Sequence, residues 1–209
     1  MPRQSELLNS ASLTWAGIFF TVLIWSAIEP KDDFIWMLEV LPAVIAPVIL
    51  VLTYKAFPLT PLVYLLILLH CIILMVGGHY TYAEVPLFDW LREPMGWTRN
   101  HYDKVGHFAQ GFVPALIARE ILLRRSPLQP GKWLFFIVAC ICLAISAFYE
   151  FVEWWVAVAT GTAAEAFLAT QGYVWDTQSD MLYALIGAIV AQLLLGRLHD
   201  RQLATLSAV

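Results

Sequence analysis

The sequence predicts an all-α membrane protein: a polytopic bundle of about six transmembrane helices that forms one domain over residues 1–209. Hydrophobic residues make up 60% of the chain and charged residues only 13%, against about 25% in an average soluble domain. Six apolar windows recur, each close to the ~20 residues that a helix needs to cross the hydrocarbon layer. A soluble protein is thereby excluded, and no room remains for a separate soluble domain.

The six windows are expected at residues 8–28, 34–54, 58–78, 103–123, 133–155 and 176–196. The first is too long for a signal-peptide core of about 7–15 residues, so it should be retained as a span. The first three are strongly apolar, whereas the last three reach full length only by including charged residues at one end. The longest irregular stretch, near 77–102, contains Pro86 and Pro94 and should form an outer loop or cap.

The basic residues predict the orientation of the spans. The connection between the fourth and fifth windows carries Arg119, Arg124, Arg125 and Lys132, whereas residues 156–175, between the fifth and sixth, have no Lys or Arg. Cytoplasmic connections carry the excess of positive charge. Placing the N-terminus and the C-terminus in the cytoplasm puts eight of the twelve basic residues on that side.

Polar residues gather at the predicted outer ends of four spans. Residues three or four apart on a helix face the same way, and three such pairs begin or end the last three spans. These pairs are Asp103 with His107, Glu150 with Glu153, and Asp176 with Asp180. The end of the third span adds His79 and, just beyond it, Glu84. One depth of the bundle therefore collects most of the intramembrane charge.

This combination of residues suits a metal site. Carboxylates near hydrocarbon stay ionised only when protons or cations neutralise them. Carboxylates with an imidazole suit zinc, manganese or iron, and helical bundles build such sites from facing helices. The predicted ligands of this divalent metal ion are Asp103, His107, Asp176, Asp180, His79 and Glu84. Glu150 or Glu153 would act as general base, although Glu153 could also be a solvated loop residue.

Several of these residues also have simpler interpretations. Asp103 and Asp176 could be acids favoured by a helix N-terminus, which leaves the second residue of each pair unexplained. His70, in mid-span, is read as a buried, hydrogen-bonded histidine outside the site. Glu39 could snorkel or join the cluster. Lys104 could pair with a cluster carboxylate or contact a lipid headgroup.

Four motifs in order carry a resemblance to a known family. They are GGHYTYAEVP at 77–86, HYDKVGHF at 101–108, EFVEW at 150–154 and WDTQSDM at 175–181. Over most of the chain the sequence resembles the YjdF-like family of bacterial inner-membrane proteins, which implies a multi-pass protein of the inner (cytoplasmic) membrane and no particular reaction. The helix start at 103–108 is also similar to that of VanZ-like membrane proteins, which implies a cell-envelope role on lipids or lipid-linked glycans.

The leading functional hypothesis is a metal-dependent enzyme that acts on a lipid or lipid-linked substrate at the outer leaflet, by hydrolysis or headgroup transfer. A cation or proton-coupled transporter is an alternative, disfavoured because the cytoplasmic halves of the spans show almost no polar residue apart from His70 and no repeat is visible. A non-catalytic membrane assembly factor is a third reading. With a net charge of -4 and no basic run, nucleic acid is not an expected partner. The oligomeric state is left open.

Overall fold

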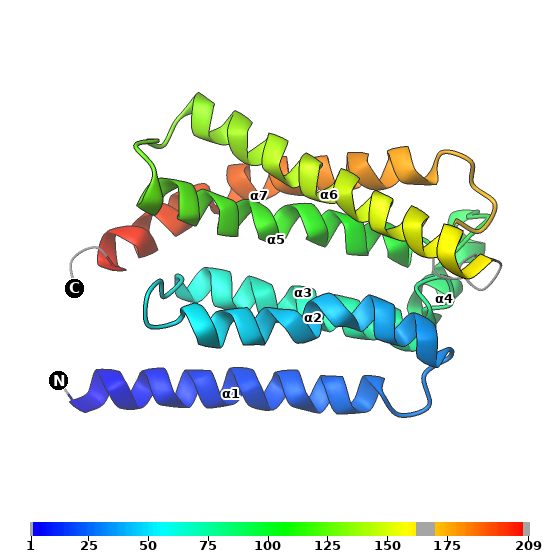
Figure 1. The fold of residues 1–209 in the computed structure, drawn as a ribbon, viewed down its shortest axis with the longest axis horizontal. Helices are drawn as coiled ribbons and strands as arrows, with labels where there is room; N and C mark the ends of the chain where they lie inside the picture. Colours follow the sequence, from blue (N-terminus) through cyan, green and yellow to red (C-terminus); the bar gives the residue numbers. More distant parts are fainter. Residues whose placement is uncertain (1, 162–169, 207–209) are drawn as a thin grey trace.

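The computed structural model describes residues 2–161 and 170–206, which form seven helices and no strand. The six long helices are α1 (Pro2–Ser26), α2 (Asp33–Thr53), α3 (Pro61–Tyr80), α5 (Tyr102–Arg125), α6 (Lys132–Thr160) and α7 (Asp176–Leu206), and the short one is α4 (Pro86–Met95). Figure 1 shows the long helices running side by side along the bundle, with α4 at one end and both the start of α1 and the end of α7 at the other. These are called the α4 end and the terminal end. The all-α class is confirmed.

The helices have the length and composition of a membrane bundle. Within the described residues, α2, α3, α6 and α7 are each long and apolar enough to cross a membrane, and the apolar part of α1, Ser10–Ser26, is shorter. The remaining long helix, α5, spans a comparable length but buries a series of polar residues, which lowers its hydropathy. The six helices follow the six predicted windows, whereas the number that cross the bilayer stays a prediction.

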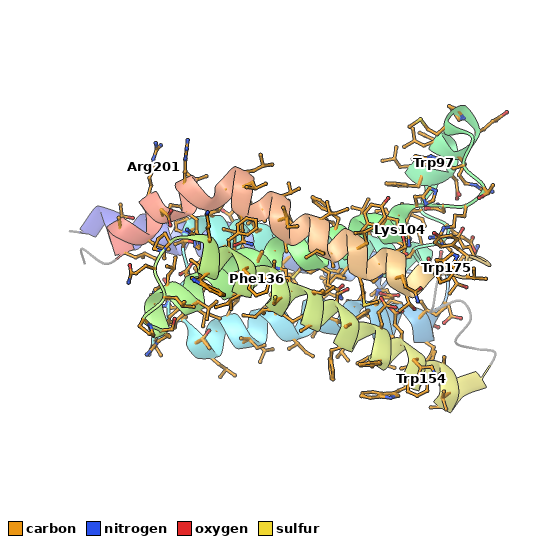
Figure 2. The ribbon with its side chains drawn as sticks, turned by 90° about the horizontal axis from the view of Figure 1, so that it is seen from above. Trp97, Lys104, Phe136, Trp154, Trp175 and Arg201 are labelled. Carbon is orange, nitrogen blue, oxygen red and sulfur yellow. The ribbon has the colours of Figure 1, made fainter. Side chains whose placement is uncertain are left out.

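Apolar side chains cover the outside of the bundle. Leu52 on α2 and Leu194 on α7 are 77% and 71% exposed, as expected for surfaces that face lipid tails. Figure 2 places Trp97, Trp154 and Trp175 at the α4 end, together with Lys104, and Arg201 at the terminal end. Tryptophan is enriched where membrane and water meet. The bundle therefore has two polar ends and an apolar belt between them.

Small residues let α5 and α7 approach closely in the centre. A Cβ atom built on Gly111 of α5 would lie 1.7 Å from the carbonyl oxygen of Ala184, and one built on Gly187 of α7 would lie 2.1 Å from that of Phe108. Close backbone contact of this kind is a common way for membrane helices to pack. It holds together the first turns of α5 and α7, which carry two of the predicted polar pairs.

A left-handed turn at the end of α3 directs Tyr82 back into the bundle. Thr81 and Tyr82 have φ values of 59° and 49°, and the Tyr82 amide donates a 2.8 Å hydrogen bond to Gly77 O. The phenol ring fills the space left by two glycines, because Cβ atoms on Gly77 and Gly106 would lie 2.1 and 2.8 Å from it. Tyr82 is thus held between α3 and α5, beside the polar cluster.

Candidate functional site

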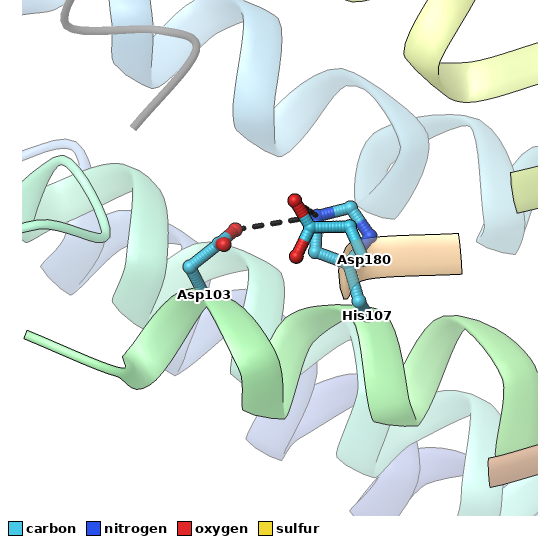
Figure 3. A group of neighbouring side chains, drawn as sticks. All are labelled: Asp103, His107 and Asp180. Carbon is cyan, nitrogen blue, oxygen red and sulfur yellow. Dashed lines mark ion pairs between the residues drawn. The ribbon is translucent and has the colours of Figure 1, made fainter. Parts of the chain in front are cut away.

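Asp103, His107 and Asp180 form the centre of a buried polar cluster at the α4 end (Figure 3). Asp103 and His107 lie one turn apart on α5, with Asp103 Oδ1 3.2 Å from His107 Nε2. Asp180, on the facing turn of α7, places Oδ2 3.9 Å from the same nitrogen. One imidazole nitrogen therefore faces two carboxyl groups on two helices.

The other nitrogen of His107 faces α6. His107 Nδ1 lies 3.2 Å from Gln110 Oε1 and 4.0 Å from Glu150 Oε1. Glu150 Oε1 is buried and has no hydrogen-bond partner within the described residues, and Glu153 presents an oxygen to the same space. A buried, unpartnered carboxyl oxygen is costly, so this side of the cluster has room for a further donor or a cation.

Lys104 and Arg99 neutralise part of the cluster. Lys104 Nζ lies 3.3 Å from Asp103 Oδ2, 3.0 Å from Asp176 Oδ1 and 2.5 Å from Asp180 Oδ1. Arg99, in the loop before α5, places Nη2 2.7 Å from Asp176 Oδ1. The side chains of Lys104, Arg99 and Asp176 are all less than 10% exposed. Asp176 is therefore held by two cations, and it belongs to neither group of possible metal ligands around His107 among the described residues.

The donor atoms around His107 fit the requirements of a divalent metal. Donors that share one ion at about 2.1 Å lie no more than about 4.2 Å apart, and the 3.2 and 3.9 Å separations at His107 Nε2 meet this limit. Two sets of possible ligands share the histidine. Asp103 and Asp180 lie beside Nε2, and the second set is Glu150, which lies beside Nδ1, with Glu153. A ligating histidine commonly donates its second N–H to an oxygen, as Gln110 Oε1 would allow.

Two of the predicted ligands lie outside this cluster. The His79 ring lies against Trp25 and places Nδ1 3.1 Å from Ser26 O. Glu84 is half-exposed and forms an ion pair with Lys31. The left-handed turn that ends α3 explains this, because it sends Tyr82 inward and leaves its neighbours on the side of α1 and the α1–α2 loop. The expectation that His79 and Glu84 join the other ligands is corrected accordingly.

Two residues that the sequence did not assign to the metal site line a cavity beside the cluster. A cavity of about 210 Å³ between α2, α3, α5 and α6 is lined by Glu39 and His70 together with Asp103 and His107. The interpretation of His70 as a hydrogen-bonded histidine is wrong for the described residues, because its ring forms no hydrogen bond with any of them. Glu39 lies on α2 and His70 on α3, whereas Asp103 and His107 lie on α5. Spacing along the sequence does not predict contacts between different helices.

A second buried polar cluster lies at the terminal end. Glu120 and His199 are completely buried, and His199 Nε2 lies 3.0 Å from Glu120 Oε2. Glu120 also accepts hydrogen bonds from the Thr60 amide and hydroxyl and from Arg124 Nη1. Arg119 Nη1 lies 3.1 Å from His199 Nδ1. The expectation of almost no polar residue in this half of the bundle is therefore wrong.

Comparisons with known proteins indicate a membrane protein. Residues 11–201 match the family described as "Predicted membrane protein (DUF2238)". The chain is 51% identical over 197 residues to inner membrane protein YjdF of Escherichia coli (strain K12). The aligned region covers 94% of this chain and 92% of that protein. No solved structure matches. The predicted YjdF-like resemblance and the inner-membrane location are confirmed, and the chain belongs to the DUF2238 family of predicted membrane proteins.

Proposed function

We propose that the buried cluster at the α4 end binds a divalent metal ion and that the protein is a metal-dependent membrane enzyme acting on a lipid or lipid-linked substrate. The observation that carries this proposal is the placement of His107, whose Nε2 faces Asp103 and Asp180 at 3.2 and 3.9 Å. A neutral imidazole nitrogen and two carboxylates can share a metal ion. The unpartnered Glu150 oxygen on the other side of the ring also supports a bound cation.

The charge of the cluster also favours a cation. Its carboxyl groups are Asp103, Asp176, Asp180, Glu150 and Glu153, and its permanent cations are Arg99 and Lys104. Lys104 contacts Asp103, Asp176 and Asp180, and Arg99 contacts Asp176, so two positive charges face five carboxyl groups. An excess of buried carboxylates is stable only with bound protons or cations. Zinc, manganese and iron all accept this ligand set.

The arrangement supports hydrolysis or headgroup transfer. Asp103, His107 and Asp180 would hold the metal, which would supply Lewis-acid activation of a substrate oxygen. Glu150, with a free buried oxygen 4.0 Å from the histidine ring, would accept a proton from the attacking nucleophile as general base. Glu153, one turn further along α6, would pass a proton to the leaving oxygen, whose bond to the transferred group would break as the bond to the nucleophile forms.

We further propose that the six long helices all cross the inner membrane, with the terminal end in the cytoplasm. Lys55, Arg124, Arg125 and Lys132 lie in or next to the connections of the terminal end, and Arg201 lies near the end of α7. The α4 end, with its tryptophans and acidic residues, would then face outward. This orientation would give the proposed metal site access to the outer leaflet.

Elemental analysis tests the proposed metal site. The detergent-purified protein should contain about one zinc, manganese or iron ion per chain after repletion, and the His107→Ala, Asp180→Ala double variant should contain none, because a site without its histidine and a carboxylate loses most of its affinity. The matched control is His79→Ala with Glu84→Gln, which lies outside the cluster and should retain the metal. Absence of metal from the repleted wild-type protein would contradict the proposal.

One observation favours the alternative of a cation or proton-coupled transporter. Polar residues lie at both ends of the bundle, in the His107 and Glu120 clusters, and His70 lines the cavity between α2, α3, α5 and α6. Polar groups spread over the depth of the membrane typify ion pathways. If the enzyme proposal holds, proteoliposomes should show no cation or proton flux above that of empty liposomes. Flux that disappears in Asp180→Asn would instead establish transport.

A further inference from the structure

The cavity beside the cluster contains a buried acid that lacks a partner. Glu39 is only 7% exposed, and no hydrogen bond or ion pair joins its carboxyl group to another described residue. Gly78 lets α2 approach α3 at this level, since a Cβ there would lie 3.3 Å from that of Glu39. A buried carboxyl group without a partner is unfavourable. The side chain is therefore positioned for a ligand that the cavity admits.

The polar lining of this cavity contains three carboxyl groups and two histidines, and no permanent cation among the described residues. Glu39, Asp103 and Glu153 contribute carboxyl groups, and Tyr82 and Tyr149 contribute phenols. Lys104 and Arg99 instead line a separate cavity of about 420 Å³, towards the loop at 171–173. Burial, and next the nearby Glu39, raise the pKa of Tyr82 well above its usual range, so its hydroxyl group stays neutral. A headgroup whose only charge is negative would be repelled here, whereas an ammonium group would be attracted.

The position of the cavity would let a ligand enter it sideways from the lipid bilayer. Pro42 on α2 and Ile145 on α6 both line it, and both are exposed on the apolar surface of the bundle. α2 packs on α3, and α6 packs on α5 and α7, whereas α2 and α6 make little contact with each other. A volume of about 210 Å³ suits a small headgroup, with the acyl chains left in the surrounding membrane.

We infer that this cavity binds the headgroup of an amine-bearing lipid, which enters between α2 and α6 and places its ammonium group against Glu39. The inference rests on the proposed function in one respect, since it assigns the substrate class of the same site. An ammonium group gains from a desolvated carboxylate and from tyrosine rings. Asp103 and His107 line the cavity as well, so a bound headgroup lies beside the proposed metal ligands.

Lipid binding to the purified full-length protein tests the inference. The probes are phosphatidylethanolamine and phosphatidylglycerol labelled on the acyl chain, titrated in detergent with a chelator present. The amine lipid should bind at least about tenfold more tightly, and Glu39→Gln should abolish most of this preference, because it removes the charge that a buried ammonium group pairs with. Glu93→Gln, an exposed acid on α4, is the matched control and should behave as the wild type.

Two further measurements define the site and the source of the amine. Ile145→Trp should narrow the opening and weaken binding of the amine lipid, whereas Phe148→Trp, on the exposed surface of α6 outside the cavity, should not. Free ethanolamine should compete only weakly, and competition at the affinity of the lipid would overturn the lipid as ligand. Equal affinity for the two lipids, or full binding to a folded Glu39→Gln protein, would overturn the inference.

The result is separable from that of the metal analysis. The chelator removes any metal, so selective binding of the amine lipid by a protein that never retains metal would support the cavity and contradict the metal enzyme. A protein that holds metal but binds both lipids equally would contradict only the cavity. Unfolded variants are recognised by thermal unfolding and by gel filtration before any titration.

Discussion

Replacing Gly187 with alanine is expected to lower the free energy of unfolding by about 3 kcal/mol, because the added Cβ would overlap the backbone of α5. That atom would lie 2.1 Å from Phe108 O and 2.9 Å from Phe112 N. Neither backbone atom can move without shifting the whole helix. Relief therefore requires α5 and α7 to separate along their contact, and thermal unfolding of the detergent-purified variant measures the loss.

Gly196 provides the matched control on the same helix. A Cβ built on Gly196 meets nothing within 4 Å, so Gly196→Ala should leave stability unchanged or raise it by up to about 1 kcal/mol through helix propensity. The two variants make the same chemical change on α7, but only Gly187→Ala is expected to destabilise the protein. A Gly187→Ala protein as stable as the wild type would show that the α5–α7 contact is looser than described.

The same substitution links packing to the candidate site. Asp103 and His107 lie on α5, and Asp180 lies on α7, so the separations of 3.2 and 3.9 Å at His107 depend on how closely the two helices pack. A helix displaced to accommodate one methyl group would move Asp180 away from the ring. Gly187→Ala is therefore expected to lose metal as well as stability, whereas Gly196→Ala should keep both.

The long helices could be predicted from the sequence, but which helices pack against each other could not. A run of about 20 apolar residues has one stable solution in a bilayer, since every backbone group must be bonded within the segment. Hence the predicted windows at 34–54 and 176–196 match the starts of α2 and α7. The choice of partner helix depends on residues such as Gly111 and Gly187, which look like any other glycine until two helices are docked.

Part of the candidate site could likewise be anticipated. Helical spacing alone placed Asp103 beside His107 and indicated that Glu150 and Glu153 face one way. The positions of His79 and Glu84 depend on loop conformation and could not be predicted, because the left-handed residues Thr81 and Tyr82 redirect the chain after α3. The role of Lys104 as the hub of three carboxylates required contact between α5 and α7, which no spacing within one helix encodes.

Replacing Glu120 with alanine is expected to destabilise the protein by about 3–5 kcal/mol, the usual effect of removing one partner from a buried ionic network. Glu120 is completely buried and accepts from Thr60, Arg124 and His199, which come from the start of α3, from α5 and from α7. The variant leaves the Thr60 and His199 donors without an acceptor, whereas Arg124 keeps its hydrogen bond to Pro58 O, and thermal unfolding in detergent measures the loss. The amine-lipid preference should persist at temperatures where the variant stays folded, since Glu120 lies at the opposite end of α5.

The neighbouring acid Asp200 separates this effect from that of surface charge. Asp200 pairs with Arg119 at 2.7 Å, and although Arg119 is buried, the Asp200 side chain is 42% exposed, so water can replace part of this pair. Asp200→Ala should therefore cause a smaller loss of stability than Glu120→Ala, whose carboxylate is completely buried. Equal effects of the two variants would mean that water reaches Glu120, in which case this end of the bundle would be open, as a pathway across the membrane requires.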